Sequence, residues 1–229
     1  MSDKQSEPLR YERKFLITDY SYADVLQLIK FHPACFKEIF EERSVNNIYF
    51  DALGMNNYYD NIEGEKDRVK VRIRWYGDLF GAIQKPVLEY KIKKGLLGNK
   101  RSYVLNPFLL NPDFDKKHIE SALDLESIPV AVKNELLSLK PTLLNTYKRR
   151  YFLSADKKFR ITIDYQMTFY KINFSGNTFL NKVVDNKSIV LELKYDSLDE
   201  IEGKEVGAAF PFKLTKNSKY LQGLERVLF

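Results

Sequence analysis

Residues 68–75 read Arg-Val-Lys-Val-Arg-Ile-Arg-Trp, so that four cations alternate with four apolar residues. A β-strand has a side-chain period of two, which places the cations on one face and the apolar residues on the other. Neighbouring cations on such a face lie roughly 6.7 Å apart, where two unit charges repel by about 2.5 kcal/mol at an effective dielectric near 20. The stretch therefore predicts a strand whose cationic face is either hydrated or binds an anion.

The composition indicates a globular protein, and its modest net positive charge is compatible with polyanionic partners but does not establish them. The chain has 229 residues, of which 44% are hydrophobic and 30% are charged, and its net charge is +6. We expect a flexible tail at residues 1–8 and a single domain over residues 9–229. Cys35 is the single cysteine, which excludes an internal disulfide and favours a reducing compartment. With no run of eighteen apolar residues and no signal-peptide core, we expect a cytoplasmic protein.

Hydrophobic periodicity predicts many short strands interrupted by a few helices. Strands are expected at residues 9–17, 36–42, 44–51, 68–75, 86–94, 100–105, 144–153, 158–164, 167–173 and 188–195. Helices are expected at residues 22–31, 116–123, 129–139 and 217–228, with a short irregular connection after residue 51. This order predicts the α+β class, with an antiparallel sheet that closes into a barrel.

Several predicted strands carry charges of both signs on one face. Three Glu-x-Lys pairs recur, namely Glu12 with Lys14, Glu89 with Lys91, and Glu192 with Lys194. Arg160, Thr162 and Asp164 also share a face, and Arg149 or Arg150 adds another cation. If helices cover the apolar faces, the charged faces line an interior. A polar tunnel of this kind suits a polyphosphate with a divalent metal, because cations neutralise phosphate oxygens and carboxylates hold the metal.

Other interpretations of the same residues remain open at this point. A single Glu-x-Lys pair is commonly a surface ion pair of small energy, and a cationic face alone can simply be hydrated. Nucleic acid is not expected as a partner, because the aromatic residues alternate with the charges and so cannot stack on bases held by them. His32 and His118 lie in or beside predicted helices and are not expected to be catalytic.

Eight segments together resemble a known family. They are residues 11–15 (Tyr-Glu-Arg-Lys-Phe), 71–77 (Val-Arg-Ile-Arg-Trp-Tyr-Gly), 88–91, 100–102, 147–149, 159–164 (Phe-Arg-Ile-Thr-Ile-Asp), 191–194 and 216–220. The chain resembles the triphosphate tunnel metalloenzymes, or CYTH-like proteins, and most closely the bacterial type of VTC domain, a vacuolar transporter chaperone-like polyphosphate polymerase. Arg10 departs from the wider superfamily, which has a glutamate there. This loss of a carboxylate fits the polymerase branch better than the metal-rich hydrolases.

The resemblance implies a role for each matching residue. A barrel with a polar tunnel, helices over the apolar outer faces and a C-terminal helix closing one side would carry the site. The implied catalytic residues are Lys14, Arg72, Arg74, Lys91, Lys100, Arg149, Arg160 and Lys219. The implied substrate-binding residues are Lys216, Ser218, Lys194, Glu89 and Glu12, and Glu192 would bind Mn²⁺ or Mg²⁺. Arg68 and Lys70 lie outside the family motif, and their role stays open between a hydrated strand end and a tunnel mouth.

The implied reaction is transfer of the ATP γ-phosphoryl group to a growing inorganic polyphosphate chain. Such transfer needs in-line positioning and charge neutralisation more than a strong base, so a catalytic His or Cys is not required. ATP and polyphosphate are the implied partners, with pyrophosphate or an inositol pyrophosphate and a separate membrane protein as further candidates. The alternatives are a tripolyphosphatase or nucleoside triphosphatase of the same fold, and a non-catalytic module that binds polyphosphate or inositol pyrophosphate.

Overall fold

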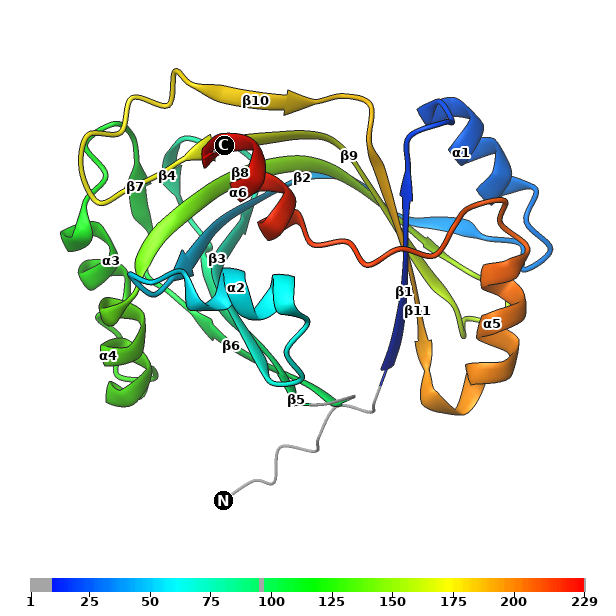
Figure 1. Cartoon of the computed structure of the whole chain (residues 1–229), viewed down its shortest axis with the longest axis horizontal. Helices are drawn as coiled ribbons and strands as arrows, with labels where there is room; N and C mark the ends of the chain where they lie inside the picture. The colour runs from blue at the N-terminus through cyan, green and yellow to red at the C-terminus, as the bar shows by residue number, and fades with distance from the viewer. Residues whose placement is uncertain (1–9, 95–96, 229) are drawn as a thin grey trace. The chain divides into compact units, whose positions relative to one another are not determined.

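The computed structural model describes residues 10–94 and 97–228, and it has the α+β architecture expected from the sequence (Figure 1). The strands are β1 (Arg10–Ile17), β2 (Lys37–Asp51), β3 (Arg68–Tyr76), β4 (Gly81–Ile83), β5 (Val87–Lys94), β6 (Leu97–Val104), β7 (Phe108–Leu110), β8 (Lys140–Leu153), β9 (Arg160–Lys171), β10 (Lys182–Asp185) and β11 (Ile189–Asp196). The helices are α1 (Tyr22–Lys30), α2 (Asn56–Glu63), α3 (Lys116–Ala122), α4 (Val130–Ser138), α5 (Glu200–Ala208) and α6 (Lys219–Leu228), with a 3₁₀ turn, η1 (Ser197–Asp199). The tail expected at residues 1–8 lies outside the described residues.

The antiparallel sheet follows the hydrogen-bonded order β1-β11-β9-β8-β2-β3-β5-β6, and β10 pairs with β9. Two pairs of strands expected to be separate are each continuous, and they form β2 and β9. Gln166 in β9 has φ of 50°, a local irregularity of the kind found at a β-bulge, which keeps the strand continuous where the sequence suggested a break. The connection expected after residue 51 contains helix α2 instead of irregular chain.

The described residues form two compact units, and strands β2, β8 and β9 contribute to both. Unit 1 contains the described residues up to Glu42 together with Arg149–Gln166 and Asn186–Asn217. Unit 2 contains Arg43–Lys148, Met167–Asp185 and the described residues from Ser218 onward. Each unit has its own apolar core.

In unit 1, helices cover the apolar face of β1, β11 and β9. Val25 and Ile29 of α1 are fully buried, and this helix begins with a capping box between Ser21 and Asp24. Helix α5 lies against β11 because Gly203 has no side chain. A Cβ atom there would be 2.5 Å from the ring of Tyr195. The charged side chains of these strands therefore project to the opposite face.

In unit 2, helices α3 and α4 cover the apolar face formed by residues such as Ile73 and Leu88, and the C-terminal helix covers part of the other face. Ile73, Leu88, Ile119 of α3 and Leu136 of α4 are all fully buried in one core. Helix α6 packs closely at Gly223, where a Cβ atom would be 2.5 Å from Leu143 and 2.6 Å from Phe169. Among the described residues, none of the helices has the length and apolar character needed to cross a bilayer.

Candidate functional site: two charged clusters

The first candidate site lies in unit 2, and we call Arg72, Arg74, Glu89 and Lys100 the arginine cluster. Strand pairing brings these residues together, because Arg72 lies opposite Glu89 between β3 and β5. The Glu89 carboxylate accepts from Arg72 Nε at 2.8 Å, lies 2.7 Å from Arg72 Nη2 and 3.6 Å from Arg74 Nη1, and contacts Lys100 Nζ at 2.6 Å. Glu89 is 5% exposed, so three cations converge on one buried anion.

Glu89 and Arg72 of the arginine cluster stabilise each other's charged forms. Burial raises the pKa of Glu89, but Arg72, Arg74 and Lys100 together lower it to about 2. Burial lowers the pKa of Arg72, whereas Tyr49 and Glu89 raise it above its usual value. One carboxylate therefore balances only one of three cations, and the remaining positive charge would favour an anion.

Further predicted cations lie on the same face of unit 2. Lys70 pairs with Lys91 across β3 and β5, and Lys91 pairs with Lys100 across β5 and β6. Lys70 Nζ donates to Ser218 Oγ at 2.9 Å, directly before α6, and Lys219 Nζ lies 4.8 Å from the ring centre of Tyr147. Lys70, whose role the sequence left open, therefore contacts Ser218, a predicted substrate-binding residue.

Two asparagines that sequence reasoning missed support Arg74. Arg74 Nε donates to Asn47 Oδ1 at 3.2 Å, and Asn47 Nδ2 donates to Asn145 Oδ1 at 2.9 Å. A guanidinium group can only donate, so it fixes the orientation of both amides. Both asparagines are fully buried, and Nδ2 of Asn145 has no hydrogen-bond partner among the described residues. Asparagines inside apolar strands are the sequence signal that could have identified them.

The second candidate site lies in unit 1, and we call Glu12, Lys14, Glu192 and Lys194 the carboxylate cluster. Lys14 lies opposite Glu192, and Glu12 lies opposite Lys194, between β1 and β11. Lys14 Nζ is 3.1 Å from Glu12 and 3.2 Å from Glu192, while Lys194 Nζ is 3.2 Å from Glu192. Burial lowers the pKa of Lys14, but Glu192 and Glu12 raise it above its usual value, so the ammonium group stays charged.

The remaining predicted residues of unit 1 lie on β9, β8 and the segment before α6. Arg160 is exposed and pairs with Lys194 across β9 and β11. Arg149 is buried and binds Asp164 through two bonds of 2.5 and 2.6 Å. Arg150, the alternative to Arg149 in the sequence, instead binds Glu38 and Tyr22. Lys216 is exposed.

The carboxylate cluster has suitable donors for a divalent cation. Glu192, which is 6% exposed, lies opposite Thr162, whose buried hydroxyl has no hydrogen-bond partner among the described residues. No group of three or more His, Cys, Asp or Glu gathers as a metal site within residues 10–94 and 97–228. Mg²⁺ in phosphate-binding proteins commonly uses one or two carboxylates and completes its shell with phosphate oxygens and water. Glu192, Glu12 and the Thr162 hydroxyl fit that requirement.

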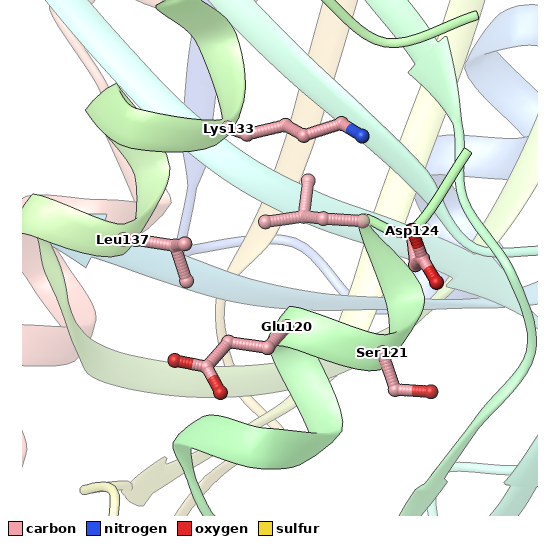
Figure 2. Close-up of a pocket in the computed structure, with 6 residues that line it drawn as sticks. Glu120, Ser121, Asp124, Lys133 and Leu137 are labelled. Carbon is pink, nitrogen blue, oxygen red and sulfur yellow. The ribbon is translucent and has the colours of Figure 1, made fainter. Parts of the chain in front are cut away.

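A cavity of about 390 Å³ lies elsewhere in unit 2, beside α3 and α4. Figure 2 shows Lys133 and Leu137 on one helix facing Glu120 and Ser121 on the other, with Asp124 at one side. Its lining has two carboxylates and one ammonium group, which disfavours a polyanion. The two clusters therefore remain the better candidates for a phosphate site.

Comparison with known proteins agrees with the fold. The PH1819 protein from Pyrococcus horikoshii OT3 superimposes with a TM-score of 0.50 at 15% identity, covering 94% of this chain and 96% of that one. A protein from Vibrio parahaemolyticus described as a candidate adenylate cyclase gives a TM-score of 0.54 at 10% identity, covering 93% and 96%. Identities this low show a shared fold alone.

The sequence comparisons give the family. A search of curated proteins returns no match. The family model of the VTC domain matches residues 9–228, and these residues include every member of the arginine cluster and of the carboxylate cluster. This protein belongs to the VTC-domain family.

Proposed function

We propose that the protein is a polyphosphate polymerase that transfers the ATP γ-phosphoryl group to the end of an inorganic polyphosphate chain. The observation that carries the proposal is the arginine cluster, in which three cations surround one buried carboxylate within a VTC domain. The excess positive charge suits a chain of phosphates, since each phosphate offers several anionic oxygens.

Glu89 supports this function by orienting the cations. Two contacts of 2.8 and 2.7 Å, from Nε and Nη2, hold the Arg72 guanidinium group against Oε2 of Glu89. An arginine held in this way loses little conformational entropy when it binds phosphate, and its remaining N–H groups can bind substrate oxygens. Tyr49 and Asn47 lie opposite Arg72 and Arg74 on β2 and complete the support.

The proposed reaction needs little covalent help from the protein. A terminal oxygen of the polyphosphate chain attacks the γ-phosphorus, the bond from this phosphorus to the β–γ bridging oxygen breaks, and ADP leaves with that electron pair. The acceptor oxygen is anionic near neutral pH, so no strong base is required. The protein contributes in-line positioning and neutralises the charge on the transferred group.

The carboxylate cluster has two proposed tasks. Lys14 and Lys194 would bind phosphate oxygens, and Glu192 with Glu12 would hold Mn²⁺ or Mg²⁺. A divalent cation bound there would neutralise charge on phosphate oxygens as a Lewis acid. The rise in the pKa of Lys14 above its usual value keeps its ammonium group protonated for this role.

Phosphorus NMR separates this proposal from its alternatives. The purified protein is incubated with ATP and either Mn²⁺ or Mg²⁺, and ³¹P spectra are recorded as ATP is consumed. Resonances of internal phosphates with release of ADP are the expected result. If orthophosphate is the sole phosphate product besides ADP, the protein is a hydrolase. If ATP stays unchanged, the result favours a non-catalytic binding module. Either of these outcomes contradicts polymerase activity.

A further inference from the structure

A buried carboxylate at the end of β2 connects two helices of unit 2. Oδ1 of Asp51 accepts from the backbone N–H groups of Ala52 at 2.7 Å and Asn57 at 2.9 Å. Oδ2 accepts from the backbone N–H of Tyr58 at 3.0 Å and from the phenol of Tyr220 at 2.5 Å. Asp51 is fully buried, so its position is set by these four hydrogen bonds.

Helix α2 fixes the carboxylate. Asn57 and Tyr58 lie in the first turn of α2, where backbone N–H groups have no partner within a helix. Met55 at the N-cap has φ of 57° and makes no side-chain cap hydrogen bond. Asp51 therefore caps α2 from outside the helix, and the positive end of the helix dipole favours its negative charge.

Helix α6 is held by the same carboxylate through Tyr220. The ring of Tyr220 is 2% exposed and stacks on Tyr49, with ring centres 5.2 Å apart. Burial raises the pKa of Tyr220, and the hydrogen bond to Asp51 raises it further, so the phenol keeps its proton and donates. The two residues before Tyr220 are Ser218 and Lys219, which contact Lys70 and Tyr147.

We infer that Asp51 and Tyr220 are positioning residues that hold the start of α6 so that Ser218 and Lys219 face the bound phosphate chain. This inference rests on the proposed function, because it assigns Ser218 and Lys219 to phosphate binding. The hydroxyl of Tyr220 is the critical group, because it ties the first turn of α6 to a carboxylate that α2 has already fixed. Loss of that hydroxyl leaves the ring and the cap of α2 in place, so it loosens α6 selectively.

Tyr220→Phe tests the inference, with Tyr58→Phe as the matched control. Both changes remove one phenol hydroxyl from the same pair of helices, but Tyr58 contributes its backbone N–H to Asp51, which the control retains. Hydrogen exchange is measured at α6 amides such as Gln222, whose N–H donates to the Ser218 carbonyl at 3.0 Å. Tripolyphosphate affinity is measured by calorimetry on the same samples.

Tyr220→Phe is expected to speed exchange in the first turns of α6 and to weaken tripolyphosphate binding about tenfold, the loss typical of a hydrogen bond to a charged group. The control is expected to change neither. A double-mutant cycle with Lys219→Ala should show that the effects of Tyr220→Phe and Lys219→Ala are not additive, because both act through the same bound phosphate.

The outcomes distinguish the inference from the proposed function. If the unmodified protein does not bind tripolyphosphate, both fail. If it binds, but Tyr220→Phe leaves either α6 exchange or affinity unchanged, the positioning role alone is overturned. Additive effects of Tyr220→Phe and Lys219→Ala would also overturn it.

Discussion

The arginine cluster and the carboxylate cluster are built from nearly the same strand sequence but differ in charge balance. Residues 87–91 read Val-Leu-Glu-Tyr-Lys and residues 190–194 read Val-Leu-Glu-Leu-Lys. In the first, Glu89 faces the arginines of β3, so cations exceed carboxylates. In the second, Glu192 faces Lys14 of β1, which Glu12 also binds, so the charges balance. The neighbouring strand therefore decides the charge balance around a Glu-x-Lys motif.

This difference suggests different tasks for the two glutamates. Glu89 is held by three cations, which leaves it little capacity to coordinate a metal. Glu192 shares Lys14 with a second carboxylate and lies opposite an unsatisfied hydroxyl, as a metal-binding carboxylate would. The proposed division is that Glu89 orients cations, whereas Glu192 binds the divalent ion.

The largest effect is expected from Arg72→Ala. This change removes a cation and both guanidinium contacts with Glu89 Oε2, so phosphoryl transfer should fall by roughly a hundredfold or more. Arg150→Ala is the matched control, because Arg150 also contacts a glutamate, Glu38, through two guanidinium nitrogens. It belongs to unit 1, where it lies over the ring of Phe152, and it is not part of the arginine cluster. Turnover is measured as ADP release. Comparable activity in the two variants would contradict the assignment of the arginine cluster.

Glu192→Gln and Glu89→Gln test the proposed division directly. Glu192→Gln should raise the Mn²⁺ concentration needed for half-maximal activity by about tenfold or more, since it removes a charged ligand. Glu89→Gln should lower turnover with little change in that concentration, because it disturbs the orientation of Arg72. Activity is measured across a metal titration for both variants. The same metal response in both would remove the distinction between the clusters.

Acid unfolding should also report on Glu89. The pKa of Glu89 in the folded protein is about 2, below its usual value of 4.5, so its ionised form is favoured in the folded state. Ionised Glu89 therefore contributes to the free energy of unfolding above pH 4.5, and this contribution is lost as the pH falls towards 2. It amounts to roughly 3 kcal/mol at most. The free energy of unfolding, measured with urea at pH 5 and at pH 3, should differ less between the two pH values in Glu89→Gln than in the unmodified protein. An unchanged dependence would contradict the charge network around Glu89.

The smallest effect is expected from Asn145→Ala. This change removes the acceptor for Asn47 and loosens the support of Arg74, without removing any charge. KM for ATP should rise a few-fold, while the overall fold, measured by circular dichroism, is retained. No change in KM would show that the amide pair does not support Arg74.

The sequence predicted the strands that carry the charges because alternation is a local signal. Residues 68–75 lie in β3 as expected, with their cations on one face and their apolar residues on the other, and the VTC family model matches residues 9–228. The sequence missed α2 because its cap is Asp51, which precedes the helix by several residues, while Met55 stands at the N-cap. It also divided β9, because it does not reveal that Gln166 adopts a left-handed conformation within a continuous strand.

Contacts between distant strands were the hardest features to predict. Strand alternation alone left Arg149 and Arg150 as alternatives, and the family resemblance favoured Arg149. The structure shows that Arg149 binds Asp164 of β9, whereas Arg150 binds Glu38 and Tyr22. The Asn47–Asn145 pair joins residues far apart in the chain, so the local sequence shows a polar residue within an apolar strand but does not show which residue it binds. Periodicity thus identifies the face on which a charge lies, whereas tertiary contacts decide which charges are neutralised.

The most direct test is a calorimetric titration of tripolyphosphate in the absence of metal, because it isolates the arginine cluster from the proposed metal site. The unmodified protein and Glu192→Gln are predicted to bind with similar affinity. Arg72→Ala is predicted to bind at least tenfold more weakly. Metal-free binding that is unaffected by Arg72→Ala, or absent from the unmodified protein, would contradict the central claim that the arginine cluster binds the phosphate chain.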